Sequence, residues 1–216
     1  MIADLIPEGA VFDCDGLLVD TEQYWHDAEA AMCRRRGVEF SAADRAGLLG
    51  ASLQVESAYF AARFGEHPAQ VGAELVDTVS SLVGAHARAL PGVVAFVAEA
   101  GRRVPLAVAS NSPRRLVEVA LRRGGLADAF THIVAADEVR HAKPHPQPYA
   151  RACELIGRDP ATVVAFEDSP TGLASARAAG LFTVGVPSEP GLTLEADHVF
   201  ASFEDTELAA WPSRWG

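Results

Sequence analysis

The chain has 216 residues, of which 49% are hydrophobic and 22% are charged. This composition is typical of a folded protein with a core of its own, and it excludes a disordered or fibrous chain. The formal net charge of −11 disfavours a nucleic-acid partner, because binding to phosphodiester backbones requires clustered positive charge. No run approaches the ~20 apolar residues of a membrane span and no secretion signal is evident, so we expect no membrane partner and a cytoplasmic protein.

Cys14, Cys33 and Cys153 are widely spaced and form no C-x-x-C pair. Three cysteines at such spacing indicate neither a disulfide framework nor a zinc site, and they fit a reducing compartment. The acidic composition is compatible with a monomer or a weak dimer.

The predicted elements begin with a short buried strand over residues 9–13. Helical patterns follow, without a plausible strand among them, over residues 20–36, 41–49, 52–64 and 69–89. At the start of the first helix, Asp20 and Gln23 have the spacing of a capping box. These helices predict an insertion of roughly seventy residues, bounded by Gly16 and by the Leu90-Pro91-Gly92 turn.

Beyond the insertion, strand and helix patterns alternate. Strands are predicted over residues 104–109, 133–136, 162–166 and 181–186, and helices over 114–123, 148–156 and 170–179. The first and last of these helices begin with Ser-Pro, as N-cap and first helical residue. This alternation is typical of the α/β class with a doubly wound, Rossmann-like parallel sheet. We therefore expect a catalytic core of residues 1–16 and 92–216 and an inserted, all-helical cap domain of residues 17–91.

Polar residues follow the first two strands that border the insertion. Asp13 and Asp15 lie at the carboxyl end of the first strand, where open α/β sheets bind their ligands, and Gly16 follows them. The two carboxylates point the same way, while Cys14 points oppositely and is expected to pack in the core. Alone, this sequence is also a common solvated turn.

The second strand is followed by Ser110-Asn111-Ser112-Pro113. A hydroxyl and an amide at the start of a helix, whose N–H groups are free, offer a site for an anion. The same residues are also a good helix start, so they are weak evidence by themselves.

Lys143 lies in a proline-stiffened loop and is the only lysine of the chain, against 17 arginines. A lone lysine indicates a need for a compact ammonium, although an accidental surface lysine is the alternative. Glu167 and Asp168 end another strand, just before a helix that Ser169 would cap. Carboxylates are poorly solvated there unless a hard cation such as Mg²⁺ compensates them, whereas Asp168 alone could simply complement the helix N-terminus.

Taken in chain order, these motifs resemble those of the haloacid dehalogenase superfamily, and most closely its β-phosphoglucomutase-like subgroup of capped phosphatases with a helical cap. The matching segments are residues 13–22 (DCDGLLVDTE), 110–113, 125–149 and 166–180 (FEDSPTGLASARAAG). The resemblance implies a Mg²⁺-dependent phosphatase that hydrolyses a small phosphorylated metabolite, such as a sugar phosphate, through an aspartyl-phosphate.

The resemblance also assigns roles to single residues. Asp13 would be the nucleophile, Asp15 the general acid and base, and Lys143 the group that neutralises developing charge. The metal would be held by Asp13, the backbone carbonyl of Asp15, Asp168, and Glu167 directly or through water. The phosphoryl oxygens would be bound by Ser110, Asn111, Lys143 and backbone N–H groups near Gly16.

Departures from the family pattern bear on the alternatives. Phosphosugar mutases of this subgroup usually have a histidine where this chain has Trp25, and an arginine for a second phosphate where it has Leu53. Both absences argue against the mutase alternative. A further departure is Gln147, which stands where the family commonly has an aspartate after the loop that carries Lys143. A dehalogenase would not need Asp15, and a silent scaffold would not need the intact set of catalytic groups.

Other candidates carry less weight. His141 and His145 flank Lys143, but no third soft ligand lies at a suitable spacing for a metal, so a solvated loop is the better interpretation. His26 could face the substrate if the first cap helix lines the cleft, but a histidine that packs in the cap or lies at the surface is the favoured interpretation. Trp211 and Trp215 near the C-terminus are expected to dock on the core.

Overall fold

In the computed structural model, which describes residues 2, 5–48, 51–188 and 191–216, six parallel strands form one sheet in the order β3-β2-β1-β4-β5-β6. The strands are β1 Gly9–Phe12, β2 Leu106–Ala109, β3 His132–Val134, β4 Val163–Glu167, β5 Phe182–Gly185 and β6 His198–Val199. β1 pairs with both β2 and β4, so the order of the strands reverses beside it. This confirms the predicted α/β class and the doubly wound sheet; β6 was not predicted.

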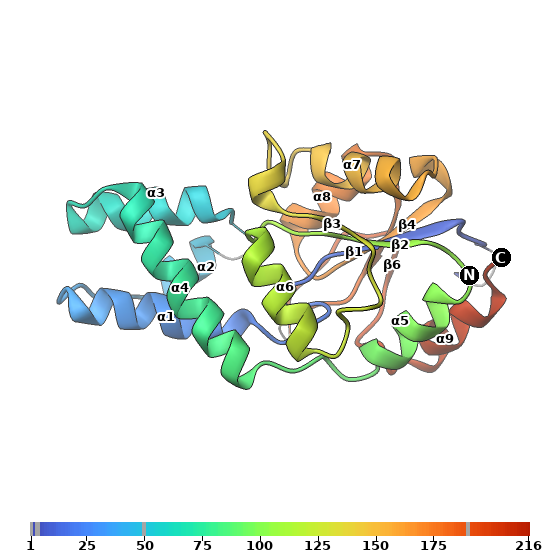
Figure 1. The fold of residues 1–216 in the computed structure, drawn as a ribbon, viewed down its shortest axis with the longest axis horizontal. Coiled ribbons are helices and arrows are strands. Elements are labelled where there is room, and N and C mark those ends of the chain that lie inside the picture. Colours follow the sequence, from blue (N-terminus) through green and yellow to red (C-terminus); the bar gives the residue numbers. More distant parts are fainter. Residues whose placement is uncertain (1, 3–4, 49–50, 189–190) are drawn as a thin grey trace.

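Helices cover both faces of the sheet (Figure 1). These are α5 Val93–Gly101, α6 Arg114–Arg123, α7 Gln147–Ile156, α8 Pro170–Ala178 and α9 Thr206–Ala210. Alternate residues of β1 point to opposite faces, because side chains alternate along a strand. Val11 packs in the cluster that includes α7, whereas Phe12 packs with Phe96 of α5 in the other cluster. Both faces are therefore apolar, as in other buried parallel sheets.

Between β1 and α5 the chain forms α1 Glu22–Arg35, α2 Ala42–Leu48, α3 Leu53–Phe64 and α4 Pro68–His86, which are called the cap helices below. They lie beyond the strand ends, at the left of Figure 1. The two segments that join them to the sheet are hydrogen-bonded to each other, with Asp20 N to Arg88 O at 2.9 Å and Leu90 N to Leu18 O at 3.1 Å. The division into a core and a cap domain at residues 17–91 stays a prediction.

The predicted capping box of α1 is wrong. The helix begins at Glu22, so Thr21 rather than Asp20 takes the cap position, and no side chain caps it. The Thr21 hydroxyl donates instead to Asp15 Oδ1 at 2.8 Å. The predicted range of α6, residues 114–123, is confirmed, but its predicted cap is wrong: Pro113 rather than Ser112 takes the cap position.

The C-terminal segment packs as expected. Trp211 and Trp215 are each 1% exposed, and Trp211 Nε1 donates to the carbonyl of Leu5 at 3.0 Å. The three cysteines are buried and unbridged, Cys14 among them. In the part of the chain that the structure describes, no helix is long and apolar enough to cross a membrane.

Candidate active site

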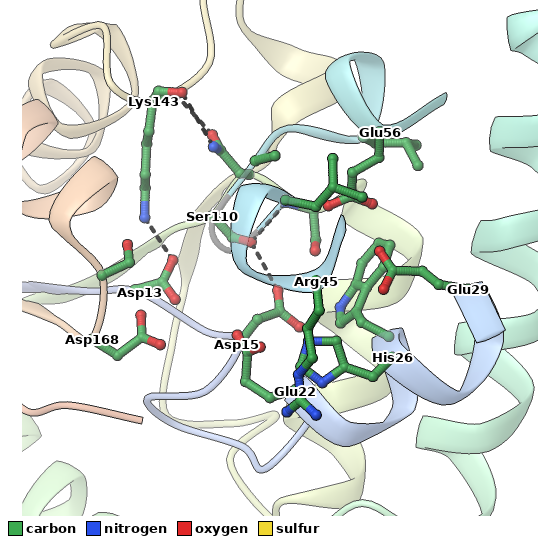
Figure 2. A pocket seen from close by; sticks show the side chains of 17 residues that line it. Asp13, Asp15, Glu22, His26, Glu29, Arg45, Glu56, Ser110, Lys143 and Asp168 are labelled. Carbon is green, nitrogen blue, oxygen red and sulfur yellow. Dashed lines mark hydrogen bonds and ion pairs between the residues drawn. The ribbon is translucent and has the colours of Figure 1, made fainter. Parts of the chain in front are cut away.

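The residues of the predicted motifs meet at one edge of the sheet. β1, β2 and β4 are parallel neighbours, so their carboxyl ends lie together. A pocket opens there between the sheet and the cap helices (Figure 2). It is lined in part by residues that the sequence predicted, namely Asp13, Asp15, Ser110, Asn111, Lys143 and Asp168. Gly16 and Glu167, also predicted, are not among its lining residues.

The ammonium of Lys143 lies among buried carboxylates. Its Nζ donates to Asp13 Oδ1 and to Glu167 Oε1, both at 2.6 Å, and the side chain is 3% exposed. Burial alone lowers the pKa of this lysine, but the charges and hydrogen bonds of Asp13 and Glu167 outweigh burial, so the pKa is raised. Lys143 is therefore a charged, buried ion-pair partner and not an accidental surface residue.

Asn111 holds the loop that carries Lys143. Its Oδ1 accepts from the backbone N–H of Lys143 at 2.8 Å, and its Nδ2 donates to the carbonyl of Lys143 at 3.3 Å. Both ends of the amide are thus engaged with one backbone, which leaves only the second N–H of Nδ2 for a ligand. In this structure the amide of Asn111 positions Lys143, and its phosphoryl contact stays a prediction.

The N–H of Gly16 itself donates to the carbonyl of Val19 at 3.0 Å. Phosphoryl binding by backbone N–H groups near Gly16 stays a prediction. The backbone of Gly16 has a φ of 75°, and a Cβ added there would lie 2.6 Å from Asp168 Oδ2. Glycine is required because only a residue without a side chain tolerates both this conformation and the close approach of Asp168.

The carboxylate of Asp15 is held apart from the other acids. It accepts from Thr21 Oγ1 at 2.8 Å and from Ser110 Oγ at 3.3 Å. Ser110 Oγ in turn accepts from the N–H of Ser112 at 2.9 Å. This arrangement orients Asp15 toward the pocket and suits a group that exchanges protons with a substrate. Its predicted metal contact through the backbone carbonyl stays a prediction.

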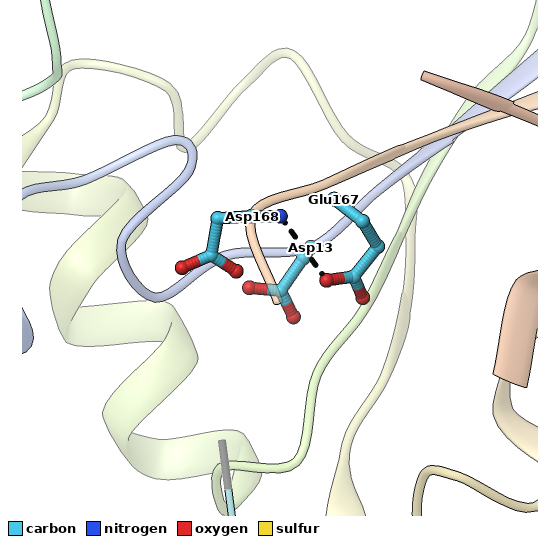
Figure 3. A group of neighbouring side chains, drawn as sticks. All are labelled: Asp13, Glu167 and Asp168. Atoms are coloured by element: carbon cyan, nitrogen blue, oxygen red, sulfur yellow. Dashed lines mark hydrogen bonds between the residues drawn. The ribbon is translucent and has the colours of Figure 1, made fainter. Parts of the chain in front are cut away.

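A group of three carboxylates lies next to Lys143 (Figure 3). Oxygens of Asp13, Glu167 and Asp168 all lie within 4.8 Å of one another. Burial raises the pKa of Asp13 and of Asp168 well above the usual range of a carboxyl group, and Lys143 partly opposes this at Asp13. The single ammonium cannot balance three ionised carboxylates in so dry a site. A hard divalent cation that prefers oxygen ligands would balance the charge of these carboxylates. The three carboxylates therefore fit Mg²⁺ as a set of ligands.

Within this group Glu167 is already satisfied by the protein. Its Oε1 accepts from Lys143 Nζ and from the hydroxyl of Tyr149, each at 2.6 Å. Its Oε2 accepts from the N–H of Asp168 and from Ser169 Oγ, each at 3.2 Å. Of the two roles left open by the sequence, a contact with the metal through water therefore fits better than direct ligation.

Sequence reasoning missed the cap side of the pocket. His26, which was expected to pack elsewhere, lines the pocket, as do Glu22, Glu29, Arg45 and Glu56. Glu29 and Glu56 are buried at 3% and 7% exposure. A signal existed, because both acids fall on the apolar faces of amphipathic helices, where a charged residue requires a reason.

Similarity to known proteins identifies the family. The model of the haloacid dehalogenase-like hydrolases matches residues 7–180. The chain belongs to this family. The resemblance inferred from its motifs is thereby confirmed, and so is the expectation of a hydrolase of the phosphatase kind.

Two curated relatives of this haloacid dehalogenase-like hydrolase are phosphatases. Validoxylamine A 7'-phosphate phosphatase of Streptomyces hygroscopicus subsp. limoneus is 31% identical over 215 residues, covering 94% of this chain and 96% of its own. Hexitol phosphatase B of Escherichia coli is 34% identical over 186 residues, covering 83% of each chain. The crystal structure of CbbY from Rhodobacter sphaeroides in complex with phosphate has a TM-score of 0.81 at 26% identity and covers 93% of this chain and 96% of its own.

Proposed function

We propose that the protein is a Mg²⁺-dependent phosphatase that hydrolyses a small phosphomonoester, of the sugar-phosphate class, through an aspartyl-phosphate on Asp13. One observation carries the proposal: Asp13 lies in the pocket with Lys143 Nζ at 2.6 Å and within the carboxylate group that it forms with Asp168. The hexitol and fructose-1-phosphate phosphatases among its relatives support the substrate class.

The residues of the pocket can perform both steps. In the first, a carboxylate oxygen of Asp13 bonds to phosphorus, the bond from phosphorus to the ester oxygen breaks, and Asp15 gives its proton to that leaving oxygen. In the second, Asp15 takes a proton from water, the water oxygen bonds to phosphorus, and the bond to Asp13 breaks. Lys143 stabilises the negative charge on Asp13 and on the phosphoryl group throughout. The Ser110 hydroxyl, which donates to Asp15 in this structure, turns to donate to a phosphoryl oxygen of the bound substrate.

Asp13 and Asp168 would hold the metal, with Glu167 bonded through water. Mg²⁺ bound there supplies positive charge that offsets the repulsion between an anionic carboxylate and an anionic phosphate. The proposed partner is a small phosphorylated metabolite. Absence of nucleic-acid and membrane partners, a monomer or weak dimer, and a cytoplasmic location stay predictions from composition.

The direct test is the release of inorganic phosphate from para-nitrophenyl phosphate and from a panel of sugar phosphates, with Mg²⁺ or with a chelator. We expect Asp13→Asn to lower kcat by ~10³-fold or more, because an amide is not a nucleophile for phosphorus. The matched control is Asp128→Asn, which changes an exposed acid of the core and should leave kcat unchanged. If Mg²⁺-dependent turnover persists in Asp13→Asn, Asp13 is not the nucleophile.

A further inference from the structure

Two carboxyl groups on the cap side of the pocket take no part in the proposed chemistry. Glu29 of α1 and Glu56 of α3 both line the pocket that holds Asp13. Figure 2 shows them on the side away from Asp13, Lys143 and Asp168. Each is more than nine-tenths buried, and in each the buried Oε2 has no hydrogen-bond partner.

Buried acceptors without a donor cost stability, so proteins keep few of them. Burial raises the pKa of Glu29 to about 7 and that of Glu56 well above its usual value, and the charge of Glu22 adds to both shifts. Arg45 of α2 opposes the shift of Glu29. Two separate helices thus each place an unsatisfied carboxyl oxygen at the same pocket. This points to a ligand whose hydrogen-bond donors reach these two oxygens.

The surroundings define what that ligand must be. Trp25, Leu48 and Leu53 line the same pocket, so its cap side combines apolar surface with carboxyl acceptors. Hydroxyl groups on neighbouring carbons are suitable donors, because one carboxyl group can accept from two of them. A second phosphate or a carboxylate on the substrate is unsuitable, because the described lining residues of this side offer three carboxyl groups, Glu22, Glu29 and Glu56, against one guanidinium, that of Arg45.

We propose that Glu29 and Glu56 determine substrate specificity by accepting hydrogen bonds from hydroxyl groups of the leaving group. The preferred substrate is then the monophosphate of a polyhydroxylated carbon chain or ring without a second anionic group. This inference rests on the proposed phosphatase function and adds to it the part of the pocket that selects the substrate.

The test compares three phosphomonoesters: glucitol 6-phosphate, hexyl phosphate, which has the same carbon count without hydroxyls, and para-nitrophenyl phosphate. We expect the wild type to prefer glucitol 6-phosphate over hexyl phosphate by ~100-fold or more in kcat/KM, since a site built for hydroxyls rejects analogues that lack them. Glu29→Leu and Glu56→Leu should each lower kcat/KM for glucitol 6-phosphate by roughly 10- to 100-fold, with little change for the other two esters. Gln at either position keeps an acceptor and should restore part of the loss.

Folding is checked separately. Since burial raises the folded-state pKa of Glu29 from 4.5 to about 7, this group lowers the stability of the protein as the pH rises from 4.5 to about 7, and the loss persists above that pH. Glu29→Leu removes this group and leaves Glu22, His26, Arg45 and Glu56 in place, so its melting temperature at pH 8 should equal or exceed that of the wild type. Glu39→Gln, an exposed acid of the cap region, is the matched control and should behave as wild type in every assay.

The outcomes separate the two proposals. If the wild type cleaves para-nitrophenyl phosphate but shows no preference for glucitol 6-phosphate over hexyl phosphate, the specificity inference is overturned while the phosphatase function stands. An equal loss on all three esters in the Leu variants would show a structural role and also overturn it. Glucosamine 6-phosphate and glucose 6-phosphate are compared as a further pair. If the first is cleaved at least 10-fold better than the second, the two glutamates bind an ammonium group, which also overturns the inference. No cleavage of any ester would overturn the proposed function, and this inference with it.

Discussion

The ammonium of Lys143 makes two hydrogen bonds of 2.6 Å, to Asp13 and to Glu167, in a space where its side chain is 3% exposed. The side-chain amide of Asn111 accepts from the N–H of Lys143 and donates to its carbonyl. A compact ammonium fits between two carboxylates, whereas a planar guanidinium needs room for a fork of donors. This geometry explains why a chain with 17 arginines has a lysine at this position.

At this scale we predict that Lys143→Arg lowers kcat on para-nitrophenyl phosphate by ~10²-fold or more, the loss expected when one preorganised charge is displaced from the reacting group. The measurement is steady-state kinetics with saturating Mg²⁺. Arg140→Lys exchanges the same two residue types in the opposite direction at an exposed position of the same loop, and it should leave kcat unchanged. A Lys143→Arg enzyme with more than half of the wild-type kcat would contradict the assigned role.

Helix α8 approaches the end of β4 so closely that one of its residues must be glycine. A Cβ added to Gly172 would lie 1.9 Å from Glu167 Oε1, far inside van der Waals contact. The same helix is capped by Ser169, whose hydroxyl accepts from the N–H of Gly172 at 3.1 Å and donates to Glu167 Oε2 at 3.2 Å. The start of α8 therefore sets the position of Glu167, and through it the position of Lys143.

We expect Gly172→Ala to displace the Glu167 carboxylate, to lower the free energy of unfolding by about 1–3 kcal/mol and to reduce kcat. Chemical denaturation and phosphate release measure the two effects. Gly84→Ala in α4 is the control, because a Cβ there meets only Val119 Cγ1 at 3.6 Å, an ordinary contact. That change should be neutral or stabilise by up to ~1 kcal/mol. If Gly172→Ala and Gly84→Ala have the same stability and the same kcat, the close packing of α8 on Glu167 contributes to neither.

The whole molecule places an excess of buried negative charge between the sheet and the cap helices. Asp13 and Glu167 are paired with one ammonium, Asp168 lies beside these two carboxylates, and Glu29 and Glu56 lie across the pocket. Burying so many acids opposes folding, unless cations or donors bound in the folded state compensate them. Stability and binding are therefore linked over the entire fold.

For this reason we predict that Mg²⁺ raises the melting temperature relative to chelator, by the equivalent of about 2.7 kcal/mol when the ion is present at 100 times its Kd. Differential scanning calorimetry with a Mg²⁺ titration measures the shift. Asp168→Asn should lose most of it, while Asp128→Asn should keep it. An Asp168→Asn protein with the full Mg²⁺ shift would place the ion elsewhere.

Much of this architecture follows from local sequence patterns. Apolar runs ending in Asp13, Ala109 and Phe166 predicted three neighbouring strands, because buried parallel strands are continuous apolar segments. The helices and strands that were missed are α5, β6 and α9. β6 and α9 have only two and five residues, and α5 begins with an apolar run whose pattern does not separate helix from strand. The capping box failed because the hydroxyl of Thr21 bonds to Asp15, a residue of the active site, rather than to its own helix.

The sequence by itself determined the fold class, the family motifs and most of the residues that meet at the sheet edge, because strand ends and helix starts are local properties of the chain. Only the tertiary structure decided how those residues are used. It showed that Asn111 positions Lys143, that the N–H of Gly16 is engaged with Val19, and that Glu167 is satisfied by protein donors. It also brought Glu29 and Glu56 from separate helices to one pocket. Hydrogen-bond partners and burial depend on how distant segments pack, and no spacing within a single segment encodes them.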